Sequence, residues 1–167
     1  MKSFKVGKNE KGSFKYTGFR ILQTVEGIML NQDEYTKSCI EILPIAPERQ
    51  SDKTSKLTEE ERSNLRKMTG SLNWVVRATR PDLSFEMIEL STKFRSGTID
   101  DLIRVRKALT NLQNNKAEIK IPHLGNPKNW IIICYTDAAL GNLNDGVDST
   151  GGFVIFITNA DRKECAV

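Results

Sequence analysis

Three consecutive amphipathic helices, each with a recognisable start, are the pattern in the middle of this chain that most restricts its fold. Thr58 and Glu61 have the spacing of a capping box, and Thr98 and Asp101 repeat that spacing forty residues later. Large apolar residues recur every three or four positions in three segments: Leu65, Met68, Leu72, Val75 and Val76; then Leu83, Met87, Leu90 and Phe94; then Leu102, Val105, Leu109 and Leu112. Helices of this kind must pack together or against a sheet.

Strand signals come before this helical stretch. Residues 14–30 alternate in a way that predicts a β-hairpin with its turn at Gly27. Asn31 stands three residues before Glu34, the capping-box spacing again, and predicts the start of a short helix. Residues 46–56 are polar and begin near two prolines, so we expect a linker there.

After the helices, the spacing between apolar residues changes from three or four positions to two. Ile119 and Ile121 alternate with lysines, residues 130–135 form a nearly continuous apolar run, and residues 152–157 form another. We therefore expect an α+β fold divided into a region of strands and a short helix at 1–45, a linker at 46–56, a helical region at 57–116 and a second unit with its own sheet at 117–167.

Composition excludes several classes of protein. Lysine and arginine exceed aspartate and glutamate by 25 to 21, a net charge of +4, which permits a phosphate-bearing partner without demanding one. The three cysteines have no paired spacing, as expected of reduced thiols. The first residues lack the apolar core of a signal peptide and no later run suits a membrane span, so we expect a cytoplasmic or nuclear location.

Asp137 is the candidate catalytic and metal-ligating residue. It follows the apolar run 131–135, where a strand is expected to end, and small residues beside it leave room for a metal or a phosphate. Asp145 and Asp148 lie in the following loop and could approach it. Two-metal phosphodiester cleavage needs several such carboxylates, whereas a strand-ending aspartate that caps a turn is the commoner arrangement.

Basic residues on the helices are the candidate nucleic-acid ligands: Arg77, Arg80, Arg95, Arg104 and Arg106. A solvated helix surface explains the same pattern. Trp74 stands beside Val75 and is expected in the core, and Cys134 is expected to be a small buried residue. The glycines between 141 and 152 fit neither the dinucleotide fingerprint nor the Walker pattern.

Six blocks, taken in order, make the chain recognisable. They are Phe14-x-Tyr16-Thr17-Gly18-Phe19, Gly27-Ile28-x-Leu30-x-Gln32-x-x-Tyr35, Leu65-Arg66-x-x-x-Gly70-Ser71-Leu72-x-Trp74, Thr79-Arg80-Pro81-Asp82-Leu83-Ser84-Phe85, Tyr135-Thr136-Asp137-Ala138 and Asp148-Ser149-Thr150-Gly151-Gly152-Phe153. Together they resemble the pol polyprotein of copia-type LTR retrotransposons. The resemblance runs from the end of the reverse transcriptase, through its helical connection, into the beginning of ribonuclease H.

This resemblance implies functions for the parts. Residues 14–45 would be the late palm, the three helices would be the thumb and connection that grip template and primer, and residues 117–167 would begin the mixed sheet of ribonuclease H. Asp137 would be the first carboxylate of its Mg²⁺ site, and an RNA–DNA hybrid would be the partner. The paired aspartates of the polymerase and the later acids of ribonuclease H have no counterpart in this chain, so we expect it to be catalytically incomplete on its own.

Other functions stay open at this point. A host-adopted, non-catalytic nucleic-acid-binding protein would keep the basic helices and no enzyme. A scaffold module would bind proteins instead, and an unstable relic would expose an unpaired sheet edge and an uncovered apolar face.

Overall fold

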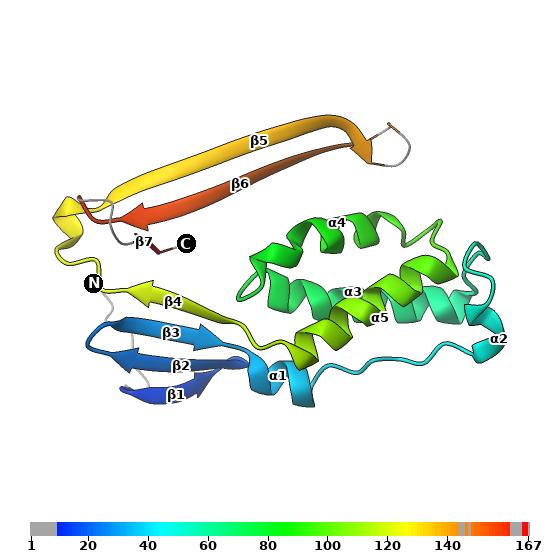
Figure 1. Ribbon diagram of the computed structural model, residues 1–167, viewed down its shortest axis with the longest axis horizontal. Coiled ribbons are helices and arrows are strands. Elements are labelled where there is room, and N and C mark those ends of the chain that lie inside the picture. Colours follow the sequence, from blue (N-terminus) through cyan, green and yellow to red (C-terminus); the bar gives the residue numbers. More distant parts are fainter. Residues whose placement is uncertain (1–9, 144–145, 147, 161–164, 167) are drawn as a thin grey trace, which may run out of the picture.

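The computed structural model describes residues 10–143, 146, 148–160 and 165–166, and it has an α+β fold (Figure 1). The first sheet has the order β1-β2-β3-β4, with β1 (Ser13–Tyr16), β2 (Phe19–Thr24), β3 (Gly27–Asn31) and β4 (Glu118–Pro122). The second has the order β5-β6-β7, with β5 (Ile131–Leu143), β6 (Asp148–Thr158) and β7 (Cys165–Ala166). The helices are α1 (Asp33–Ser38), α2 (Pro47–Gln50), α3 (Glu59–Val76), α4 (Ser84–Thr92) and α5 (Ile99–Asn114), with single 3₁₀ turns η1 (Pro81–Leu83) and η2 (Pro127–Asn129).

The two long helices begin where their capping boxes predict. The Thr58 amide donates to the Glu61 carboxylate over 2.8 Å, and the Glu61 amide donates back to the Thr58 hydroxyl over 3.2 Å. At the start of α5, the Thr98 amide donates to the Asp101 carboxylate over 2.8 Å. Each box satisfies backbone groups that the first turn of a helix leaves without partners.

The core lies among the helices. Residues of α3, α4 and α5 that the periodicity identified reach complete burial, namely Leu65, Leu72, Leu90, Val105 and Leu109. Two polar links join α1 to this core: the Thr79 hydroxyl donates to the buried Gln32 side chain over 2.8 Å, and the Gln113 amide donates to the Thr36 carbonyl over 3.1 Å. Among the described residues, no helix has the length and apolar character needed to cross a bilayer.

Strand β4 returns to the first sheet and pairs with β3 in antiparallel register, from Gly27 opposite Pro122 to Asn31 opposite Glu118. The expected division at residue 117 placed β4 with the C-terminal strands, so that expectation is wrong for β4. The strand's apolar alternation fits either sheet, and only the pairing decides. Gly27 permits the close approach, because a Cβ there would lie 2.2 Å from the Ile121 carbonyl oxygen.

Three local predictions also differ from the structure. Residues 14–30 contribute to three strands rather than one hairpin, and Gly27 begins β3 instead of forming the turn. Asn31 belongs to β3, and α1 begins one position later with Gln32 as its N-cap and no side-chain cap bond. The expected linker 46–56 contains α2 and is docked: the Arg49 guanidinium bonds both oxygens of Glu61 over 2.9 Å, and Lys56 forms an isolated β-bridge with Thr98. Polar composition alone does not reveal that ion pair.

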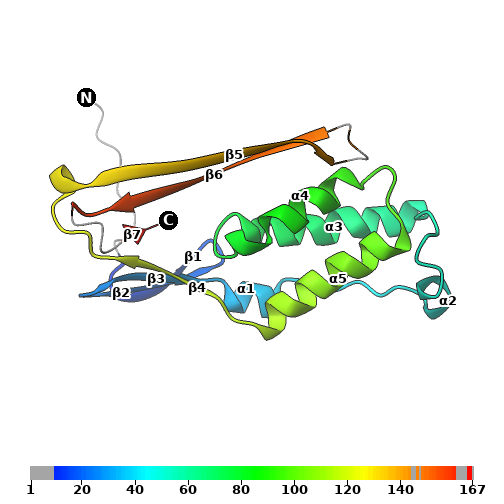
Figure 2. The same ribbon diagram turned by 45° about the horizontal axis from the view of Figure 1, so that its top comes forward.

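The β5–β6 hairpin extends along the helices and past the first sheet, as both views of the ribbon show (Figures 1 and 2). All described pairings in its sheet are antiparallel, so the expected mixed sheet stays a prediction. Large apolar side chains on the hairpin face solvent, including Ile132 at 71%, Phe153 at 72% and Ile155 at 45% exposure. The hairpin therefore presents an apolar surface that the described residues leave uncovered.

Replacing Glu61 with glutamine should lower the melting temperature by about 2 to 4 °C, the cost of one helix cap in a chain of this size. Hydrogen bonding to Arg49 holds the pKa of Glu61 at about 2, below its ordinary value of 4.5. Because the pKa is lowered in the folded state, this stabilisation is complete above pH 4.5 and is lost as the pH falls toward 2. Thermal unfolding of both proteins at pH 7, 4.5 and 3, followed by circular dichroism, measures it.

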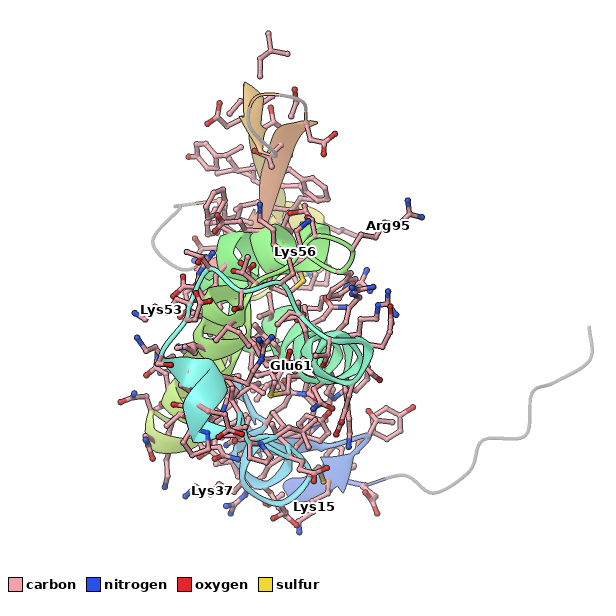
Figure 3. The ribbon with its side chains drawn as sticks, turned by 90° about the vertical axis from the view of Figure 1, so that its right-hand side faces the viewer. Lys15, Lys37, Lys53, Lys56, Glu61 and Arg95 are labelled. Carbon is pink, nitrogen blue, oxygen red and sulfur yellow. The ribbon has the colours of Figure 1, made fainter. Side chains whose placement is uncertain are left out.

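Glu60→Gln is the matched control, because Glu60 lies in the same first turn and is exposed (Figure 3 labels the neighbouring Glu61). It should change the melting temperature by less than half as much. Equal losses in the two variants would show that the macrodipole, rather than the Arg49–Glu61 pair and the cap, accounts for the effect.

Candidate nucleic-acid interface

A polar and basic surface follows the solvent side of α3. We call it the α3 outer face and define it by Arg66, Gly70, Asn73, Trp74 and Arg77, which recur at helical intervals. Trp74 is 45% exposed, and a Cβ added at Gly70 would meet no atom within 4 Å. The acids of α3 are confined to its first turn, so from Arg62 to Arg77 the helix carries only positive charge.

The turn between β1 and β2 rests against this face. Its two residues both have positive φ, 46° at Thr17 and 86° at Gly18, as a tight two-residue hairpin requires. A Cβ at Gly18 would lie 3.7 Å from the Trp74 indole nitrogen, and the ring centroids of Phe19 and Trp74 are 6.2 Å apart. A β-branched threonine rarely adopts positive φ, so the packing around the turn must hold it there.

A cavity of about 190 Å³ lies beside the turn, between β1, β2 and α1. Tyr35 lines it, and the pKa of its hydroxyl is raised, chiefly by burial and then by Cys39. Lys15 and Glu34 close its rim with an ion pair of 2.6 Å. Arg20 also lines the cavity, so its walls carry a cation besides that pair, with the exposed ring of Tyr16 at the entrance.

The five arginines proposed from the sequence lie in different surroundings. Arg77 is exposed on the α3 outer face with no ion pair to any described residue. Arg80 is only 12% exposed and pairs with Asp82 over 2.8 Å, which raises the pKa of the arginine and lowers that of the aspartate. Arg104 donates to Glu89 over 2.6 Å and lies within 4.0 Å of Glu86.

Arg80 and Arg104 are therefore structural cations whose charge carboxylates already neutralise, and the structure does not support them as phosphate ligands. Arg106 lies on α5 and faces a different surface from Arg77. Arg95 is exposed at the end of the helical body and points away from it (Figure 3). Helical spacing alone cannot separate these cases, because it does not report which acids lie across the interhelical contact.

Asp137 lies inside β5 rather than at its end, because the strand continues to Leu143. It is exposed, it pairs with Gly152, and its carboxylate accepts a hydrogen bond of 2.9 Å from the Ala138 amide. Its place inside a continuous strand differs from the strand-ending, turn-capping alternative, although the carboxylate does bond a neighbouring backbone amide.

The other two acids do not complete a site around Asp137. Asp148 stands opposite Leu143, six residues along β5, which is roughly 20 Å from Asp137 at about 3.3 Å per residue. The prediction that Asp148 approaches Asp137 is therefore wrong, because the hairpin is long. Asp145 lies outside the described residues. Within the described part of the chain, no three acids, histidines or cysteines are grouped as a metal site requires.

Cross-strand pairing assigns the hairpin residues to two faces. Tyr135, Asp137, Val154 and Phe156 share one face, where the Tyr135 and Phe156 rings meet edge to face with centroids 5.9 Å apart. The opposite face carries the exposed apolar side chains of Ile132, Phe153 and Ile155, together with Cys134, which is exposed although the sequence predicted it buried.

The sequence reasoning missed Trp74 and Gly70 as surface residues, and it wrongly placed Trp74 in the core. The sequence did contain a signal that Trp74 lies on the surface. At 3.6 residues per turn, Trp74 lies about 200° around the helix from Leu72, on the opposite side from the buried stripe. An exposed glycine in the middle of an 18-residue helix, where alanine would be more stable, is a second signal.

Comparisons with known family models, curated proteins and solved structures find no match for this chain.

Arg104→Ala should destabilise the fold by about 1 kcal/mol, because it leaves Glu86, Glu89 and Asp101 close together without their shared cation, partly screened by solvent. Arg77→Ala should cost no more than about 0.5 kcal/mol, the interaction of an exposed cation with a helix end. Urea unfolding at pH 7 compares them. A larger loss from Arg77→Ala would contradict the assignment of Arg77 as a free surface cation.

Proposed function

We propose that this chain is a nucleic-acid-gripping part of a copia-type retrotransposon pol polyprotein, and that it binds an RNA–DNA hybrid or related duplex with the α3 outer face and the β1–β2 turn. The family's role is RNA-directed DNA synthesis followed by cleavage of the hybrid. In this proposal the chain supplies binding surface from both enzymes and is catalytically incomplete by itself. The motif resemblance and the geometry of α3 support it.

The observation that carries the proposal is the pairing of Gly70 with Trp74 on α3. One helical turn separates them, so a side-chain-free notch and a half-exposed indole lie side by side. A glycine costs a helix interior about 1 kcal/mol relative to alanine. This arrangement suits a partner whose backbone approaches the helix closely, while the indole packs against sugar and base edges.

Charge favours a nucleic-acid partner over a protein partner at this face. Arg66 and Arg77 lie at its two ends, and no acid lies on α3 between them. Arg77 has no ion pair to a described residue, and the Arg66 guanidinium makes only a 3.5 Å contact to the Phe94 carbonyl. Two cations about three helical turns apart can contact phosphates on both sides of a groove.

A second candidate function, a scaffold or interaction module, has one observation in its favour. The apolar face of the β5–β6 hairpin, with Ile132 and Phe153 more than two-thirds exposed, is the kind of surface that another protein segment covers. In the main proposal the remainder of the polyprotein covers it and supplies the acids that would join Asp137 around Mg²⁺. In the alternative, a separate protein does.

Gly70→Ala separates function from stability. It should stabilise the fold by about 0.5 to 1 kcal/mol through helix propensity and, at the same time, weaken hybrid binding several-fold because the added methyl group occupies the notch. Trp74→Ala should weaken binding by roughly tenfold, about 1.4 kcal/mol. Fluorescence anisotropy with a labelled RNA–DNA hybrid measures binding, and urea unfolding measures stability.

Val25→Ala is the control, because Val25 is 95% exposed in the turn between β2 and β3, at the opposite end of β2 from the β1–β2 turn. It should leave the affinity within twofold. Arg77→Ala should lower the slope of log affinity against log salt by about 1, as the loss of one phosphate contact does. If Gly70→Ala stabilises the chain and leaves affinity unchanged, the outer face is not the interface.

The isolated chain should not cut the RNA strand of a hybrid in Mg²⁺. One carboxylate cannot hold the two metal ions that stabilise the attacking water and the leaving oxygen. Gel analysis of a labelled hybrid incubated with the wild-type chain and with Asp137→Asn provides the test. Cleavage by the wild type that disappears in the variant would overturn the proposed incompleteness and make Asp137 a working ligand.

A further inference from the structure

A second basic surface lies on α5, away from the α3 outer face. We call it the α5 groove; it is an open hollow of about 510 Å³ between α5 and α2. The side chains that concern its chemistry are Gln50, Arg106, Lys107, Thr110, Asn111 and Asn114. None of the residues that line it belongs to α3 or to the β1–β2 turn.

The two cations of the groove lack carboxylate partners among the described residues. Arg106 forms no ion pair there, and its Nε atom is buried without a hydrogen-bond partner. Lys107 is exposed, also with no ion pair in this part of the chain. Arg104, two residues earlier on the same helix, has three carboxylates within 4.0 Å. The contrast means that the acids of the bundle neutralise one side of α5 and leave the groove positive.

The remaining wall of the groove is neutral and rich in hydrogen-bonding groups. Asn111 and Asn114 supply side-chain amides, and Gln50 adds one that also donates to the Ile45 carbonyl. Thr110 adds a hydroxyl oxygen, whose proton is donated to the Arg106 carbonyl, and no aspartate or glutamate lines the hollow in the described residues. Amides donate to phosphate oxygens and to base edges alike, whereas a protein partner of mixed charge would be expected to meet acids as well. The chemistry matches an extended polyanion with hydrogen-bonding bases.

We propose that the α5 groove binds a single-stranded nucleic-acid segment, with Arg106 and Lys107 on its phosphates and the amides on its exposed base edges. A single strand, unlike a duplex, presents base edges that short amide side chains can reach. This inference rests on the proposed function, and it extends the ligand from a duplex to a duplex with a single-stranded extension. The two surfaces can be tested separately because they share no residue.

The test measures the binding of a labelled single-stranded oligonucleotide by anisotropy over a range of salt concentrations. The Arg106→Gln/Lys107→Gln double variant should bind about tenfold more weakly, and its slope of log affinity against log salt should fall by about 1 to 2, as the loss of two phosphate contacts requires. The charge-matched control is Lys56→Gln/Lys128→Gln, two exposed cations outside the groove (Figure 3 labels Lys56), which should stay within twofold of the wild type. Arg106→Lys/Lys107→Arg, which keeps both charges, should restore most of the affinity.

Several results would overturn the inference. Equal losses in the groove variant and the matched control would mean that net charge alone attracts the strand. Unchanged oligonucleotide binding together with lost binding of a polyglutamate peptide would make the groove a site for acidic proteins. Absence of single-strand binding by the wild-type chain would also exclude it. Circular dichroism must show the same fold in every variant compared.

The Trp74→Ala variant distinguishes failure of the α5 groove inference from failure of the proposed function. If Trp74→Ala weakens duplex binding while the groove variant binds single strands normally, only the α5 groove inference fails. If the groove variant loses single-strand affinity while Trp74→Ala leaves duplex binding unchanged, the groove inference stands on its own and the duplex proposal fails.

Discussion

The pairing of β3 with β4 is the interaction on which the rest of the structure depends. It joins two segments separated by the whole helical region and makes residues 32–117 an insertion between neighbouring strands of one sheet. Gly27 allows the strands to approach, since any side chain there would collide with the Ile121 carbonyl. The insertion then brings α3 back against the β1–β2 turn, where Phe19 and Trp74 meet. The α3 outer face thus receives its shape from the sheet as well as from the helix.

Much of this arrangement could be predicted from the sequence. Capping residues and 3.6-residue periodicity are local properties, so Thr58, Glu61 and the stripe containing Leu65 and Leu72 were placed correctly. The strand that pairs with β4 could not be predicted from the sequence, because an alternating strand fits either sheet and only long-range packing selects one. The docked segment around Arg49 was missed for the same reason: its composition resembles that of a free linker.

In the candidate site, too, the sequence predicted some features and could not predict others. Arg77 could be proposed from spacing, but whether an arginine is free or neutralised depends on acids that another helix supplies, as Glu89 does for Arg104. Trp74 was assigned to the core because it stands beside Val75, although its angular position on α3 opposes that assignment. The separation of Asp148 from Asp137 depends on hairpin length, which carries Asp148 far along the strand. Residue type suggested what each side chain could bind, and its neighbours in the folded chain determine whether it is free to do so.

The insertion between β3 and β4 also has a consequence for the order of folding. Asn31 and Glu118 are partners in the sheet, yet the chain between them must become compact before they can meet without a large loop-closure entropy. Helices form and associate through contacts close in sequence, which are fast, whereas pairing at such separation is slow. The helical bundle would therefore organise first and serve as the clamp that brings the two strands together. In a growing polypeptide, β4 could join the sheet of β1, β2 and β3 only after the helical bundle had been synthesised.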